Sequence, residues 1–249
     1  GAFAYPDSVN DLAQTGQMDP HKVCITCSAC TQIMRDGGRT GCVVRDSEIY
    51  GAEYRRVRKT SADVLKKEAE RCRDCDSPMC QLACPANLDI PGFIKAYGKG
   101  DIAKAYSILS ENNIFPEMCA LICPVEVQCK GACVENIFSR RPVAISEIQQ
   151  AIAKQARAQG LVNIVVPSQP SGRKVAIVGA GPAGMSCAAK LLQFGHHVDI
   201  FEKASTIGGI PGTVIPFERI DSQIVLNEVN NLFIDAKEKR RLAIHRSEE

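Results

Sequence analysis

No apolar run in this chain of 249 residues approaches the roughly 18 residues that a membrane-spanning helix needs. The chain also lacks the charged and apolar segments of an export signal at its start. Its 30 basic and 28 acidic residues leave a net charge of +2, without the strong basic excess typical of nucleic-acid binding. These absences predict a cytoplasmic protein that binds neither membrane nor nucleic acid.

Histidine is absent between residues 22 and 195, whereas cysteine is abundant, with 13 residues in the chain. Many cysteines without an export signal indicate a reducing compartment, where thiols hold metal rather than form disulfides. Structural zinc sites favour paired Cys-x2-Cys knuckles, or such knuckles combined with histidine. The two main cysteine runs contain one knuckle between them, so their spacing favours iron–sulfur ligation over zinc.

Eight of the 13 cysteines form these two runs, which read Cys72-x2-Cys75-x4-Cys80-x3-Cys84-Pro85 and Cys119-x3-Cys123-Pro124-x5-Cys129-x3-Cys133. A [4Fe–4S] cube needs about four ligands, and the cysteine before a proline commonly serves the other cluster of a pair. This pattern assigns one cluster to Cys72, Cys75, Cys80 and Cys133. The second cluster receives Cys84, Cys123 and Cys129, which leaves one ligand position open.

A third cysteine group lies near the start of the chain and consists of Cys24, Cys27, Cys30 and Cys42. Its spacing alone suits either a cluster or zinc, since both accept thiolate cages. Together with the stretch Ala2-Phe3-Ala4-Tyr5-Pro6-Asp7, the group resembles the end of the flavin barrel in the old yellow enzyme and 2,4-dienoyl-CoA reductase family. Two residues rather than three separate its second and third thiols. Over residues 1–50 the resemblance implies a third [4Fe–4S] cluster and an FMN barrel as a neighbouring domain or partner.

Residues 51–160 contain no alternating strand pattern and therefore predict an all-α segment. Ser61, Asp101 and Ser146 each precede apolar residues at helical spacing, so each is expected to cap a helix. The third helix is expected to end at Gly160.

The same segment resembles the N-terminal domain shared by dihydropyrimidine dehydrogenase and the small subunit of glutamate synthase. The resemblance rests on both cysteine runs and on Asn87-Leu88-Asp89-Ile90-Pro91. It implies an α-helical ferredoxin-like domain that carries two [4Fe–4S] clusters. It also implies a glutamine as the fourth ligand of the second cluster, which is Gln149 here, with Glu147 and Cys119 as alternatives.

Residues 161–172 predict a linker, because two prolines, two serines and a glycine fall within its second half. A β-branched strand then leads into a Gly-x-Gly-x-x-Gly turn and a helix, and a second strand ends at Glu202. In this arrangement the glycines and the helix amides approach a pyrophosphate, and the acid accepts ribose hydroxyls. The pattern predicts a Rossmann domain over residues 173–249, with a dinucleotide at Gly179, Gly181, Pro182, Ala183, Gly184, Glu202 and Lys203.

Two further stretches resemble flavoproteins of the glutathione reductase type. Gly208-Gly209 lies where a second backbone approach to the pyrophosphate is expected, and Ile215-Pro216-Phe217-Glu218-Arg219 is similar to Ile-Pro-x-Phe-Arg, with its phenylalanine one place early. The resemblance implies FAD, held in part by Gly208, Gly209 and Arg219. Cys187 is expected in the core, and residues 237–241 and 247–249 are expected to form a polar, charged tail. Because half a Rossmann sheet cannot bury both faces, we expect a truncated chain or one completed by a partner.

Together these features predict a multi-domain α + α/β protein, with an all-α iron–sulfur domain followed by a partial Rossmann domain. The predicted function is an oxidoreductase that passes electrons from NAD(P)H through FAD to the clusters, and on to a partner domain or subunit. We expect an oligomer or a complex, and no residue stands out as catalytic. The alternatives are a non-catalytic electron-transfer subunit and a zinc-stabilised, dinucleotide-binding redox sensor.

Overall fold

The computed structural model describes residues 7–17, 19, 24, 29–35, 39, 41–52, 54 and 62–247. The chain divides into two compact units, Gly1–Thr60 and Ser61–Glu249. The first contains helices α1 (Asp7–Thr15) and α2 (Ala29–Arg35) and the π-helical turn η3 (Ser47–Gly51). Ile33, Val43 and Tyr54 form its small hydrophobic cluster.

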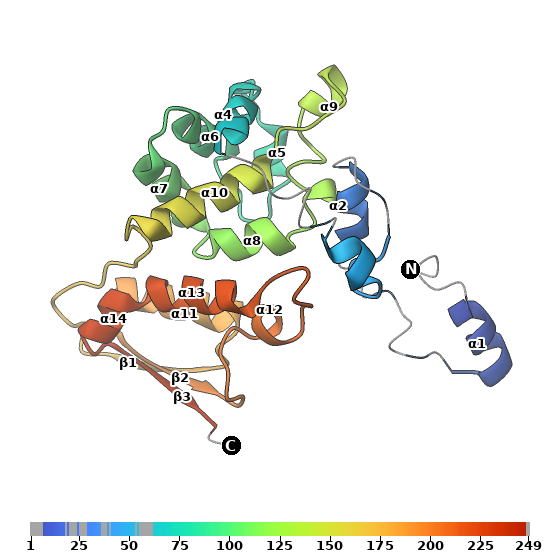
Figure 1. Cartoon of the computed structure of the whole chain (residues 1–249). Coiled ribbons are helices and arrows are strands. Elements are labelled where there is room, and N and C mark those ends of the chain that lie inside the picture. The colour runs from blue at the N-terminus through green and yellow to red at the C-terminus, as the bar shows by residue number, and fades with distance from the viewer. Residues whose placement is uncertain are drawn as a thin grey trace. The chain divides into compact units, whose positions relative to one another are not determined.

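The second unit begins with a helical half, seen in the upper part of Figure 1. Its elements are α4 (Ala62–Glu70), α5 (Met79–Leu82), α6 (Ile90–Gly98), α7 (Ile102–Asn112), α8 (Pro116–Ile122), the 3-10 turn η4 (Val125–Val127), α9 (Glu135–Phe138) and α10 (Ile145–Ala158). Helix α10 packs against α4, α6, α7 and α8. Residues 62–173 are all described and contain no strand.

Local sequence signals explain several helix ends. The Asp101 carboxylate accepts the backbone N–H of Lys104 at 2.9 Å, as the sequence predicts for the cap of α7. Gly160 follows α10 with a φ of +69°, a conformation that favours glycine after a helix. The expectation for Ser146 is wrong: α10 begins at Ile145, and the buried Ser146 hydroxyl donates to Glu147 instead. Ser61 lies outside the described residues.

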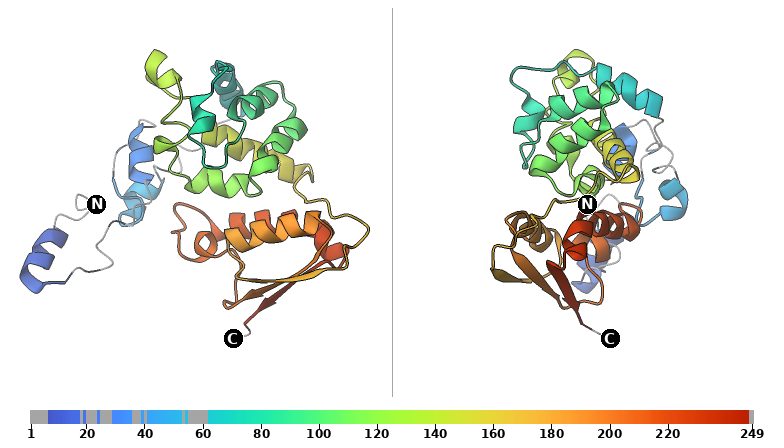
Figure 2. Two further views of the ribbon diagram at one scale, coloured as in Figure 1. Left: turned by 180° about the vertical axis from the view of Figure 1, so that it is seen from behind. Right: turned by 90° about the vertical axis from the view of Figure 1, so that its left-hand side faces the viewer.

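The second half of this unit is a three-stranded parallel sheet with helices on one face (Figure 2). Its elements are β1 (Lys174–Val178), α11 (Pro182–Gln193), β2 (His197–Glu202), α12 (Ile210–Thr213), α13 (Ser222–Leu232), α14 (Ile234–Glu238) and β3 (Leu242–Arg246). The strand order is β1-β2-β3, with Ile177 opposite Ile200 and Ile200 opposite Ile244. This is a small Rossmann-like domain.

Two expectations about this half are wrong. The expected charged tail is wrong for residues 237–241, because Lys237 and Glu238 belong to α14 and Arg241 is buried. The next residues, 242–246, form the third strand, whose parallel pairing with β2 partly buries Leu242 and Ile244. The buried guanidinium of Arg241, just before this strand, donates to the carbonyls of Gly195 and Ser168. Cys187 is exposed on α11 rather than buried, because the neighbouring Ala188 and Ala189 occupy the inward positions.

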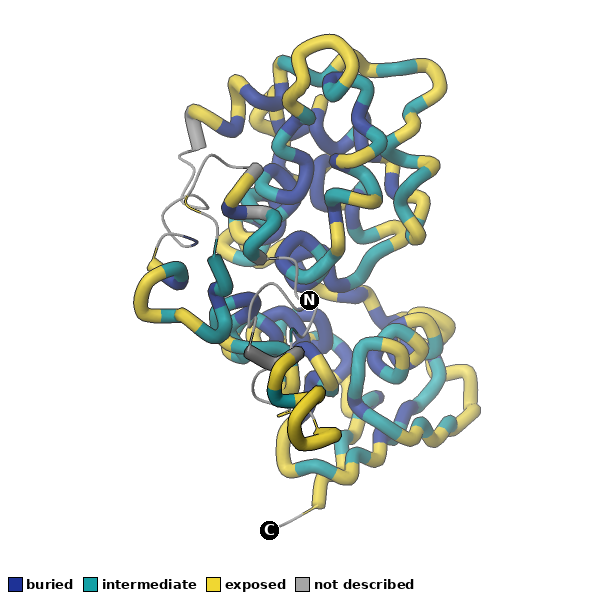
Figure 3. The backbone as a smooth tube through the Cα atoms, turned by 90° about the vertical axis from the view of Figure 1, so that its right-hand side faces the viewer, coloured by how far each residue is buried: buried dark blue, intermediate teal, exposed yellow. Residues whose placement is uncertain are grey.

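Residues 62–247 contain two hydrophobic cores, and buried residues are dark blue in Figure 3. Phe93, Leu109, Ile148 and Ile152, all fully buried, lie in the core of the helical half. The core of the Rossmann half is built on α11, α13 and β2, and it also takes in Phe115, Met118 and Leu121 from around α8. Helix α8 therefore belongs to the helical half in chain order but buries its apolar side chains with the Rossmann half. No helix among the described residues is long and apolar enough to cross a membrane.

We predict that Leu109→Ala lowers the free energy of unfolding of the iron-free chain by about 2–5 kcal/mol, because it opens a cavity in a closed core. Urea denaturation followed by circular dichroism measures the change. Leu82→Ala is the matched control: its side chain is 69% exposed, and the expected change is below about 0.5 kcal/mol. Equal effects of the two substitutions would contradict the assignment of Leu109 to the core.

Candidate iron–sulfur and dinucleotide sites

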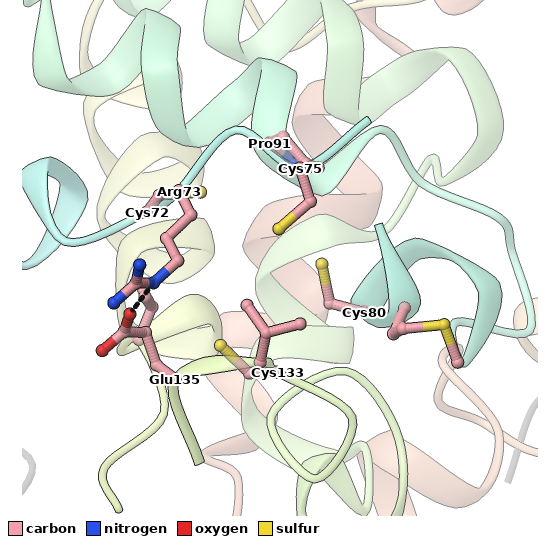
Figure 4. A pocket seen from close by; sticks show the side chains of 10 residues that line it. Cys72, Arg73, Cys75, Cys80, Pro91, Cys133 and Glu135 are labelled. Carbon is pink, nitrogen blue, oxygen red and sulfur yellow. Dashed lines mark hydrogen bonds and ion pairs between the residues drawn. The ribbon is translucent and has the colours of Figure 1, made fainter. Parts of the chain in front are cut away.

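Four cysteines of the helical half line one cavity. Cys72 follows α4, Cys75 lies in the next loop, Cys80 is on α5, and Cys133 comes from the second cysteine run. Figure 4 shows the sulfur atoms of Cys75, Cys80 and Cys133 turned toward the same space. The thiols come from both runs, in the combination that the spacing predicts for the first cluster. We call them the first thiol group.

Ion pairs support the backbone around the first thiol group. Asp74, between Cys72 and Cys75, has a φ of +50° and accepts a hydrogen bond from Lys95 on α6. Arg73 donates to the Glu135 carboxylate and stacks on the Phe138 ring, with 4.0 Å between the guanidinium carbon and the ring centroid. These contacts join the loop of Cys75 to the segment that follows Cys133.

Three more cysteines lie close enough for their charges to interact: Cys84, Cys123 and Cys129. Cys119 adjoins them, because Cys123 is the largest influence on the pKa of its thiol, which it raises. The Cys119 thiol lies 3.6 Å from the side-chain oxygen of Asn113, which can accept its hydrogen. We call these four residues the second thiol group. The charge of Cys80 also raises the pKa of Cys129, so the first and second thiol groups are neighbours.

Both groups are electrostatically unfavourable as bare thiolates. Burial, together with the charges of the nearby Cys133 and Cys72, raises the pKa of Cys80 to about 12. The pKa of Cys129 is also raised to about 12, mainly by burial and to a lesser extent by the charge of Cys84. The hydrogen bond from Cys119 lowers the pKa of Cys123, and Arg219 acts in the same direction. A metal centre would supply the missing positive charge, which is why coordinated thiols are deprotonated.

The thiol arrangement fits a group larger than a single ion. A zinc ion draws its sulfur ligands to about 2.3 Å from one point. The first thiol group lines a cavity whose wall also includes Met79, Pro91 and Val143. A four-iron cube, whose ligands bind separate irons, matches such a wider cage.

The three candidates for the fourth ligand of the second cluster, Glu147, Gln149 and Cys119, lie in different surroundings. The Lys130 ammonium and the Ser146 hydroxyl engage the Glu147 carboxylate, at 3.1 and 3.0 Å. Gln149 is 93% buried on α10, and its Nε2 donates to the Pro116 carbonyl at 2.8 Å. A carbonyl can only accept, so the amide nitrogen of Gln149, and not its oxygen, faces Pro116. Cys119 already adjoins Cys123, so Gln149 and Cys119 both remain candidates.

The predicted glycine turn has the geometry that a dinucleotide needs. A Cβ at Gly184 would lie 2.1 Å from the Gly179 carbonyl oxygen, so only glycine lets helix α11 approach the end of β1. Gly209, with a φ of +58°, packs against Gly181, and a Cβ there would lie 2.8 Å from the Gly181 Cα. The two glycine segments therefore meet at the start of α11. Pro182 is its first residue, and no side chain caps the helix, which leaves its first amides available to a phosphate.

Glu202 and Arg219 occupy distinct positions around this turn. The Glu202 carboxylate ends β2 and accepts the backbone N–H groups of Ala180 and Ala204, at 2.7 and 2.9 Å, which lowers its pKa. Lys203 and Ala183 are exposed, whereas Gly208 is buried. Arg219 is buried, and its guanidinium donates to the Cys123 carbonyl at 3.3 Å. A residue predicted at the flavin thus directly contacts the second thiol group.

The third cysteine group is described only in part. Cys24, Cys30 and Cys42 are half-buried in the first unit, whereas Cys27 lies outside the described residues. The backbone N–H of Arg45 donates to the Cys42 sulfur at 3.4 Å. A third cluster therefore remains a prediction.

Other functional contacts had no signal in the sequence. Glu228 on α13 accepts two backbone N–H groups of α8, and Glu117 pairs with Arg157 on α10. Lys130, directly after Cys129, pairs with Glu147. Each contact joins residues that are far apart in the chain and follow no spacing rule, so only the folded structure reveals them.

Comparison with known proteins agrees with this geometry. Residues 52–161 match the family of dihydropyrimidine dehydrogenase domain II, a 4Fe-4S cluster domain, and residues 177–216 match an NAD(P)-binding Rossmann-like domain. Among individual proteins, the small chain of the NADPH glutamate synthase of Azospirillum brasilense is 33% identical over 172 residues, which cover 69% of this chain and 36% of the relative.

Two other relatives show the same pattern. The corresponding small chain of Bacillus subtilis is 33% identical over 198 residues, or 76% of this chain and 38% of the relative. The NADH glutamate synthase of Schizosaccharomyces pombe is 35% identical over 175 residues, or 70% of this chain and 8% of the relative. The chain thus spans little more than a third of the bacterial small chains that it matches. The resemblance expected from the cysteine runs is confirmed: residues 52–161 match the iron–sulfur domain family of dihydropyrimidine dehydrogenase domain II, residues 177–216 match a Rossmann-like NAD(P)-binding domain, and the chain is similar to the glutamate synthase small chains.

Proposed function

We propose that this chain is the electron-transfer part of an iron–sulfur flavoprotein oxidoreductase. In this proposal the helical half, over residues 51–160, is an α-helical ferredoxin-like domain with two [4Fe–4S] clusters, and residues 173–249 hold FAD. Bound FAD would accept a hydride from NAD(P)H, and the clusters would carry single electrons to a partner domain or subunit. The names of the relatives, glutamate synthase small chains, support a place in a larger assembly.

The observation that carries this proposal is that the first thiol group, the second thiol group and the Rossmann half lie next to one another. The two thiol groups adjoin through Cys80 and Cys129, and Arg219 contacts Cys123 from the Rossmann half. We assign Cys72, Cys75, Cys80 and Cys133 to one cluster and Cys84, Cys123, Cys129 and Gln149 to the other. The glycine turn, Glu202 and the start of α11 would hold the adenosine diphosphate part of the dinucleotide, with the helix amides on the pyrophosphate.

We expect the anaerobically purified chain to be brown and to contain iron and acid-labile sulfide at about twelve atoms each: four for each of the two clusters of the helical half and four for the predicted third cluster at Cys24, Cys27, Cys30 and Cys42. Metal, sulfide and flavin analysis of one sample tests every group together. As a control, the double substitution Cys123→Ser and Cys129→Ser should remove about four irons, because a cube loses two of its ligands. A correctly folded chain with zinc and no iron would overturn the proposal in favour of a zinc-stabilised redox sensor. Bound flavin that neither NADH nor NADPH reduces would favour a non-catalytic electron-transfer subunit.

We predict that Gln149→Ala changes the EPR signal and the reduction potential of one cluster only. An amide oxygen is a harder ligand than a thiolate and alters the charge of the cluster, so its removal affects that centre first. Anaerobic EPR-monitored redox titration measures both quantities. Cys119→Ala is the matched test of the competing candidate and should leave all signals unchanged. The reverse result, with an effect of Cys119→Ala and none of Gln149→Ala, would make Cys119 the ligand.

A further inference from the structure

Helix α8 carries two residues of the second thiol group: Cys119 lies within it and Cys123 is its C-terminal cap residue. The helix has seven residues and does not cap its own start. Its N-cap residue is Phe115, which has no polar side chain, and Pro116 follows. The first amides of a helix have no acceptor within the helix, and when buried they require one from elsewhere.

The Rossmann half supplies that acceptor. The Glu228 carboxylate on α13 accepts the backbone N–H of Glu117 at 2.7 Å with Oε1 and that of Met118 at 2.9 Å with Oε2. Glu228 is only 3% exposed, and these residues are 111 and 110 positions away in the chain. Both oxygens of one side chain thus satisfy two amides that would otherwise be buried without a partner.

The Rossmann half also holds the other end of α8. Arg219 donates to the Cys123 carbonyl at 3.3 Å, and the same carbonyl accepts the backbone N–H of Val125 at 2.9 Å. The positive charge of Arg219 at the C-terminal end of α8 matches the direction of the helix dipole. Between these ends, Met118 and Leu121 pack into the core of the Rossmann half.

Helix α10, in the helical half, also contacts the first turn of α8. The Gln149 amide donates to the Pro116 carbonyl at 2.8 Å, and the Arg157 guanidinium binds the Glu117 carboxylate. The first turn of α8 is therefore held by α13 on one side and α10 on the other. In Figure 1, α8 lies between these two helices, and it contacts both of them.

We propose that Glu228 is a positioning residue of the second cluster: it clamps the first turn of α8 onto the Rossmann half and, with Arg219 at the other end, sets where Cys119 and Cys123 lie relative to the dinucleotide. The inference rests on the proposed function for its electron-transfer role, but the clamp itself is a property of the protein alone. Its consequence is that a residue without contact to either cofactor controls the environment of one cluster and not of the other.

Hydrogen–deuterium exchange of the full chain tests the clamp directly. Glu228→Ala removes both acceptors, and Glu228→Gln removes one, because its amide nitrogen donates and cannot accept. In the peptide covering residues 113–122 we expect about two additional rapidly exchanging amides for Ala and about one for Gln. Glu238→Gln, the same substitution at an exposed position of α14, should leave this peptide unchanged.

EPR of the anaerobically reconstituted full chain tests the effect on the cluster. In Glu228→Gln we expect the signal and the reduction potential of one cluster to shift, while those of the cluster held by Cys72, Cys75, Cys80 and Cys133 stay as in the unmodified chain. The double substitution Cys123→Ser and Cys129→Ser identifies the shifted signal as that of the second cluster, because it removes that signal.

Two outcomes would overturn the proposal. Unchanged exchange in residues 113–122 of both Glu228 variants would show that the carboxylate does not hold α8. Equal acceleration across residues 62–247, or equal shifts of both clusters, would show a general loss of stability instead of positioning. If the unmodified chain assembles no cluster, the proposed function fails, whereas the exchange result still decides whether the clamp exists.

Discussion

Buried thiolates repel one another, and this repulsion is the constraint on which the rest of the structure depends. Each thiol group combines residues whose burial and mutual charge raise the pKa of Cys80 and Cys129 far above neutral pH. Such a group is stable in its deprotonated form only around a centre of positive charge. The ion pairs Arg73–Glu135 and Lys130–Glu147 support the backbone beside the two thiol groups.

Helix α8 explains how the two halves of residues 62–247 act as one unit. Its chain position places it among the helices of the iron–sulfur segment, but its apolar residues lie in the core of the Rossmann half. The backbone at both of its ends is hydrogen-bonded to Rossmann residues. A cysteine helix that is shared in this way cannot move with one half alone. The position of the second thiol group relative to the glycine turn is consequently determined by packing across α8. The segment predicted as a linker contributes to that packing, because Val162, Ile164 and Val166 are buried in the two cores.

The glycine turn and the cysteine runs could be predicted because their function needs fixed local spacing. Gly184 must be glycine because its α-carbon lies against the Gly179 carbonyl, and such a requirement repeats wherever the motif occurs. The cap of α7 by Asp101 is local in the same sense. Strand β3 was missed because its five residues include charged ones, and its identity as a strand depends on pairing with β2. The misplaced cap at Ser146 has the same origin, since tertiary burial turned its hydroxyl toward Glu147.

The sequence by itself determined the chemical groups of this protein. It contains two runs of cysteines, each with a Cys-Pro pair, and the strand, glycine turn, helix and acidic residue that are typical of a dinucleotide site. These are short-range patterns, and each is complete within a few tens of residues. Only the tertiary structure decided that Cys119 adjoins Cys123, that Glu147 is occupied by Lys130, and that Arg219 and Glu228 hold the ends of α8. The physical reason is that burial creates these contacts: buried amides and charges need partners, and the partners come from whichever segment packs beside them.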